Sequence, residues 1–113
     1  MRLSCVLVAL ASLGAVLSST SANADLTNEL SHYIGYTIIA DKTVKGWVSK
    51  DGTEAEENFK GCKYGTKIVF TDNTYLTCAT YSYHYAYRPE AIILYNGSSY
   101  IMIVDSEAFD MRQ

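Results

Sequence analysis

The residues with the most unusual spacing are four tyrosines that occupy every second position of one short segment. They are Tyr81, Tyr83, Tyr85 and Tyr87, with His84 at the centre of the row. Because alternate side chains of a strand point to the same face, an unbroken strand would align all four rings. Tyrosine offers a large rigid ring with a polar tip, so the row predicts a binding platform for an extended ligand, such as an envelope protein, a peptide or a glycan. The competing interpretation is that the rings pack on neighbouring strands or under the N-terminal helix, because tyrosine suits half-buried pleated surfaces.

Catalytic chemistry has weaker support in the sequence. His84, or a carboxylate pair drawn from Asp105, Glu107 and Asp110, is a candidate for acid-base work in a cell-envelope hydrolase. No pattern of nucleophile, oriented base and oxyanion donor accompanies these residues. Neither His32 nor His84 belongs to a metal-ligand motif, so we expect no metal and no cofactor. The sequence therefore favours a non-catalytic binding or accessory protein over the hydrolase.

Two of the three cysteines predict a disulfide. Cys5 falls in a segment that we expect to be removed, which leaves Cys62 and Cys78 as an even pair. An oxidising compartment would join them, and closing a loop of this length stabilises a small domain by about 3 kcal/mol in the chain-entropy model. No C-x-x-C spacing points to thiol exchange or zinc. We expect the pair to be structural.

The first 24 residues have the pattern of a cleaved signal peptide. A positive Arg2 precedes an apolar run from Leu3 to Leu17, and Ala22-Asn23-Ala24 forms a small-x-small cleavage site. The apolar run is shorter than the roughly 20 residues that span a bilayer, so we expect no membrane span after processing. The brief n-region is typical of bacteria, which predicts a periplasmic or secreted product. In the alternative case of a eukaryotic signal, Asn96-Gly97-Ser98 would be a glycosylation acceptor.

Charge further limits the partners of the processed chain. Removal of Arg2 leaves eight basic residues against twelve acidic ones, a net charge of −4. A mildly acidic protein lacks the broad positive field that binds phosphate backbones. We therefore expect no nucleic acid partner.

Residues 25–113 are expected to form one small domain that begins with a short helix. Leu26, Leu30, Tyr33 and Ile34 form one apolar stripe at helical spacing, and Gly35 is a suitable stop. Fewer than 12 residues do not hold a helix alone, so we expect this helix to dock on another surface.

Strand patterns follow the helix. Residues 36–48 alternate with period two, with Trp47 on the polar side, and residues 49–61 carry a charge run that predicts a solvated loop. Two hairpins are expected, with turns at Asp72-Asn73 and at residues 96–99. The strand after the first turn is expected to run on until Arg88-Pro89 ends it, either unbroken or with a bulge between Cys78 and Tyr81 that switches its faces. Phe109 and Met111 alternate as in a short last strand.

These elements define the expected fold class and a third functional hypothesis. Five to six antiparallel strands with one short helix and one disulfide predict a mainly β fold, either a small SH3-like or OB-like barrel or a strongly bent sheet. Such an architecture carries no function with it. The third hypothesis is a structural or assembly subunit that pairs with another chain through exposed edge strands.

Overall fold

A computed structural model describes residues 26–113 of the chain. The expected signal peptide, including Cys5, lies outside the described residues. The chain divides after Gly35 into an N-terminal unit and a β unit, Tyr36–Gln113.

The described part of the N-terminal unit is a short helix. Residues 26–30 are α-helical and continue into the 3-10 turn η1 (Ser31–Tyr33). Gly35 ends the helix with a φ of +89°, the left-handed conformation that glycine adopts without steric cost. The predicted short helix and its stop are confirmed, and Leu26, Leu30 and Ile34 of its apolar stripe are exposed. Within residues 26–113, no helix has the length and apolar character needed to cross a membrane.

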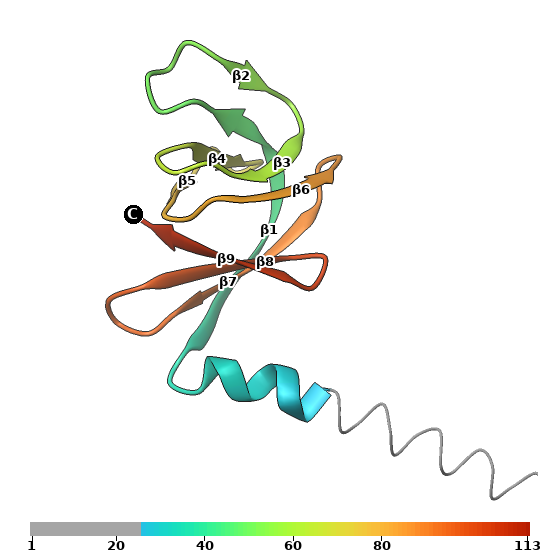
Figure 1. Ribbon diagram of the computed structural model, residues 1–113, viewed down its shortest axis with the longest axis vertical. Helices are drawn as coiled ribbons and strands as arrows, with labels where there is room; N and C mark the ends of the chain where they lie inside the picture. Colours follow the sequence, from blue (N-terminus) through green and yellow to red (C-terminus); the bar gives the residue numbers. More distant parts are fainter. Residues whose placement is uncertain (1–25) are drawn as a thin grey trace, which may run out of the picture. The chain divides into compact units, whose positions relative to one another are not determined.

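Six antiparallel strands of the β unit close into a barrel (Figure 1). In order around the barrel they are β1 (Thr37–Val48), β4 (Lys67–Phe70), β5 (Tyr75–Cys78), β9 (Glu107–Arg112), β8 (Tyr100–Val104) and β7 (Glu90–Tyr95). The barrel closes because β7 pairs with the first half of β1 and β4 pairs with its second half. The predicted small antiparallel barrel is confirmed, as are both hairpins and the last strand.

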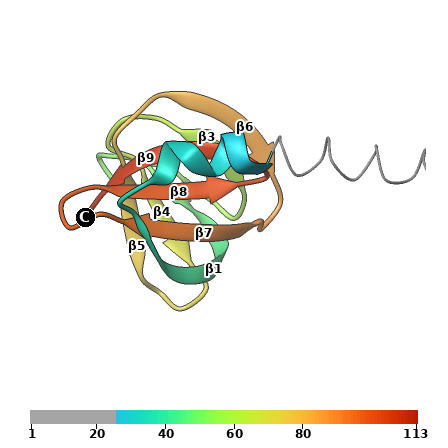
Figure 2. The ribbon, with the colours of Figure 1, turned by 90° about the horizontal axis from the view of Figure 1, so that it is seen from below.

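Three short strands are added to the barrel. β2 (Ala55–Glu56) pairs with the end of β1. β3 (Phe59–Cys62) and β6 (Ser82–Ala86) form a separate two-stranded sheet, which Figure 2 places on one side of the barrel. The disulfide predicted between Cys62 and Cys78 is present, with Cα atoms 5.5 Å apart. It joins β3 to β5, so it fastens the small sheet to the barrel wall.

The core lies inside the barrel and under the small sheet. Its largest fully buried side chains include Phe59, Phe70, Phe109, Ile68, Met102 and Val44. Phe59 and Phe109 pack edge to face with ring centroids 5.3 Å apart. The two-stranded sheet is therefore held by hydrophobic packing as well as by the disulfide.

The prediction of a solvated loop over residues 49–61 is wrong in its second half. The chain returns to form β2, and Phe59 then enters the core as the first residue of β3. Phe59 is a single aromatic residue among charged ones, so it gave no periodic signal, and its burial depends on Phe109 from the far end of the chain. Only the first half of the segment is an exposed loop.

The long strand expected to reach Arg88-Pro89 is interrupted between Cys78 and Ser82, in the stretch where a bulge was the alternative expectation. β5 ends at Cys78 and β6 begins at Ser82, and the two strands belong to different sheets. β5 pairs with β9 through Thr77 opposite Arg112 and Cys78 opposite Met111, and the Ala79 N–H still donates to the Asp110 carbonyl. The chain then leaves the barrel and crosses to β3.

Candidate functional site

The four tyrosine rings of the row are solvent-exposed. The exposed fractions of Tyr81, Tyr83, Tyr85 and Tyr87 are 73%, 78%, 55% and 71%. These rings are therefore not part of the core of the β unit, and we call them the tyrosine surface. Tyr83 and Tyr85 lie within β6, where they alternate with the half-buried His84, while Tyr81 and Tyr87 flank the strand. The expected alternation holds over β6 itself.

Gly61 of β3 allows β6 to lie where it does. Its φ is +86°, and a Cβ atom at this position would overlap the carbonyl oxygen of Ser82 and the backbone of Tyr83. The pairing of β3 with β6 also shifts register between Phe59 and Gly61. A glycine is needed because no other residue permits both this conformation and this close approach.

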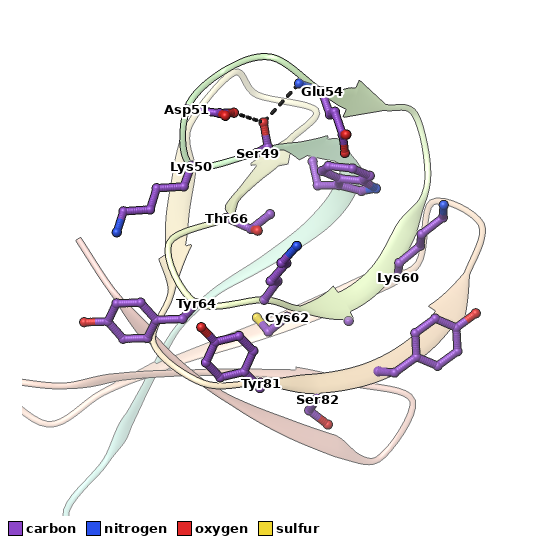
Figure 3. A pocket seen from close by; sticks show the side chains of 14 residues that line it. Ser49, Lys50, Asp51, Glu54, Lys60, Cys62, Tyr64, Thr66, Tyr81 and Ser82 are labelled. Carbon is purple, nitrogen blue, oxygen red and sulfur yellow. Dashed lines mark hydrogen bonds between the residues drawn. The ribbon is translucent and has the colours of Figure 1, made fainter.

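A groove of about 1070 Å³ lies beside the tyrosine surface (Figure 3). Its aromatic lining residues are Trp47, Tyr64, Tyr81 and Tyr83, and its charged ones are Lys50, Asp51, Glu54, Lys60 and Lys63. In Figure 3 the Tyr81 ring points into the groove from the side of β3, and Ser49, Asp51 and Glu54 lie on the opposite wall. Tyr85 and Tyr87 do not line the groove, so they extend the aromatic surface beyond it.

One wall of the groove is a loop held by its own hydrogen bonds. The Asp51 carboxylate accepts hydrogen bonds from the Ser49 hydroxyl at 2.8 Å and from the Thr53 backbone N–H at 3.1 Å. Ser49 Oγ accepts in turn from the Glu54 N–H at 3.0 Å. These donors, the Thr53 N–H first, lower the pKa of Asp51 to about 2. The wall thus presents a fixed negative charge at neutral pH.

The opposite wall is built from stacked rings. Tyr64 and Tyr81 stack with centroids 6.3 Å apart and an angle of 25° between their planes. The Arg112 guanidinium lies 5.2 Å from the centre of the Tyr64 ring. Stacking and the cation-π contact hold two exposed rings in fixed orientations, which lowers the entropy lost when a ligand binds them.

Trp47 and Lys60 form the third side of the groove. The Trp47 indole donates a hydrogen bond to the Asn58 side chain at 3.2 Å, and the Lys60 ammonium lies 5.9 Å from the centre of the Trp47 ring. Lys60 also forms an ion pair with Glu56 at 2.8 Å. A hydrogen bond within this pair raises the pKa of Lys60 and lowers that of Glu56. Both groups stay charged at neutral pH.

His84 lies outside the groove and is bound to an acid. Its Nε2 lies 3.0 Å from the Asp105 carboxylate, and its ring contacts Phe59 with centroids 6.5 Å apart. Asp105 belongs to the β8–β9 turn, where it and Ser106 have positive φ angles of 49° and 70°. Within residues 26–113, the His84 side chain makes this hydrogen bond to Asp105 and none to a hydroxyl or thiol group. The pair joins β6 to the β8–β9 turn.

The other candidate residues of the sequence do not converge on a centre. The side chains of Glu107 and Asp110 are exposed and make no hydrogen bond or ion pair with His84 in the described chain. Over the same residues, no group of three or more histidine, cysteine or acidic side chains is arranged to hold a metal ion. Comparison with known protein families, curated proteins and solved structures found no match to this chain.

Sequence reasoning missed the residues that complete the groove. Trp47 stood out only because it broke the alternation of its strand, and Tyr64 belonged to no pattern. In the fold the two reach the tyrosine surface from β1 and from the turn after β3. The one sequence feature that could have indicated the groove is a single tryptophan on the polar face of a predicted strand.

Proposed function

We propose that this chain is a small exported, non-catalytic binding protein of the cell envelope. Its contact surface is the tyrosine surface together with the groove. The observation that carries the proposal is the exposure of four closely spaced tyrosine rings, two of which also line the groove. Exposed aromatic area of this extent is uncommon on a soluble domain unless it meets a partner.

The shape and chemistry of the surface favour an extended ligand. The rings of Tyr85 and Tyr87 continue the surface beyond the groove, so a chain-like molecule can contact both regions. The groove adds hydroxyl, ammonium and carboxylate groups to the aromatic contacts, a combination suited to a peptide or a glycan. Lys50 and Lys63 form no ion pair in the described chain, which leaves two cations available to polar ligand groups.

Export is the second part of the proposal. It is supported by the signal-like pattern of residues 1–24 and by the Cys62–Cys78 disulfide, which is typical of oxidising compartments. We expect the exported protein to begin at Asp25 or within a few residues of it. Intact-mass measurement on protein recovered outside the cytoplasm tests this, and a mass that retains Met1 to Leu17 would contradict it.

Removing two rings of the tyrosine surface should leave the fold intact. We expect the double variant Tyr83→Ala with Tyr85→Ala to lower the free energy of unfolding by about 0.5 kcal/mol or less per ring, because both side chains are exposed. Urea unfolding measures the change. Losses of about 3 kcal/mol would show that the rings are part of the core.

The binding function is tested with the same variant. The wild-type protein is applied to an oligosaccharide panel and to an immobilised peptide library, and retained probes are tested again with the double variant. We expect loss of retention in the double variant, whereas Tyr75→Ala should retain the probes, because Tyr75 is also exposed but lies outside the groove. Equal retention by all three proteins would refute the assignment of the surface.

A further inference from the structure

One edge of β6 has no strand beside it. β6 pairs with β3 on one side and with no other strand of residues 26–113. No loop or turn backbone in this part of the chain makes a hydrogen bond to Ser82–Ala86 either. An unpaired strand edge presents N–H and C=O groups that can pair with another strand.

The residues of β6 do not protect this edge. Proteins usually block an exposed edge with lysine, proline or an inward-pointing charge. The segment from Tyr81 to Tyr87 has no lysine, no proline and no acidic residue, and its one titratable basic group, His84, is bound to Asp105. Its high content of aromatic residues also favours β pairing.

The sequence around His84 is nearly palindromic. It reads Tyr81-Ser82-Tyr83-His84-Tyr85-Ala86-Tyr87. When two antiparallel copies of such a strand pair about their centre, each residue faces its mirror position. A symmetric dimer requires this kind of self-complementary surface.

We propose that two copies of the chain pair through the free edges of β6, antiparallel and about a two-fold axis at His84. Tyr83 of one copy then faces Tyr85 of the other, and Tyr81 faces Tyr87. Aromatic pairs at opposed positions stabilise antiparallel strands. The two small sheets become one four-stranded sheet, β3-β6-β6-β3.

The dimer doubles the aromatic surface without burying it. Main-chain hydrogen bonds join the strand edges, so the rings stay on the outer face of the joined sheet. Two tyrosine surfaces become continuous, with one groove on each side. This inference goes beyond the binding function and does not depend on it, because the dimer forms without ligand.

Sedimentation velocity of the purified protein over a concentration series, from low micromolar to millimolar, tests the dimer and its register. We compare the wild type with Tyr83→Lys plus Tyr85→Lys, with Tyr83→Lys plus Tyr85→Glu, and with Tyr83→Glu plus Tyr85→Lys. All three variants lose the same two exposed rings. In the proposed register position 83 faces position 85 of the partner, so the lysine–lysine variant places like charges opposite each other twice and both mixed variants place opposite charges.

We expect a reversible dimer for the wild type and a dissociation constant at least about tenfold lower for both mixed variants than for the lysine–lysine variant. Thermal unfolding confirms that each variant is folded. The two mixed variants exchange the charges between positions 83 and 85, so together they control for the nearby Lys60, which interacts with both positions. A wild type that stays monomeric throughout, or equal dissociation of the three variants, would overturn the proposal.

Discussion

Phe59→Ala is expected to lower the free energy of unfolding by about 3 to 5 kcal/mol, the usual cost of deleting a buried phenylalanine ring. The Phe59 side chain is fully buried, packs edge to face on Phe109 and contacts the ring of His84. Its removal leaves a cavity between the barrel and the small sheet. Urea unfolding measures the loss.

A matched control separates this effect from the general loss of an aromatic ring. Tyr85→Ala removes a ring of similar size from the paired strand β6, but that ring is exposed, so it should cost little. A loss below about 1 kcal/mol for Phe59→Ala would contradict the described core.

Removal of the disulfide is expected to cost about 2 to 5 kcal/mol. Cys62 and Cys78 join the small sheet to the barrel, and both are buried. The double variant Cys62→Ala with Cys78→Ala avoids a free thiol, and its urea unfolding is compared with that of the wild type. Unfolding of the wild type with and without a reductant provides an independent measurement. Equal stability of the oxidised and reduced protein would show that the bond contributes nothing.

Local patterns predicted the barrel strands because those strands are short and joined by tight turns. Asn96-Gly97 lies in the turn of the β7–β8 hairpin. Phe109 and Met111 alternate along β9, and both of their side chains are buried in the core. The even number of cysteines that remains after the expected removal of residues 1–24 predicted the disulfide. Each of these features depends on residues that are close in the sequence or on a single pair of cysteines.

The errors arose where tertiary contacts decide the structure. Phe59 is buried because it packs on Phe109, fifty residues later in the chain, and no periodic pattern in the sequence predicts that contact. The break between β5 and β6 depends on the pairing of β6 with β3, a strand that is not its neighbour in the sequence. Neither quantity can be read from the local sequence.

The candidate site was predicted only in part, because some of its features depend on tertiary contacts. The tyrosine row was visible because its period matches a strand, but its exposure depends on β6 leaving the barrel. The groove requires Trp47, Tyr64 and the 49–54 loop to meet in space. Only the fold brings these segments together.

Fluorescence of Trp47 is the most direct measurement of the central claim that the groove and tyrosine surface bind an extended ligand. Trp47 is the only tryptophan in the sequence and it lines the groove, so a bound ligand should change its emission. The probes are the oligosaccharides and peptides retained in the screen. We predict a saturable change for the wild type and for Tyr75→Ala, and an affinity at least about tenfold weaker for Tyr81→Ala with Tyr83→Ala. A change that is equally strong in all three proteins, or absent from the wild type with every probe, would contradict it.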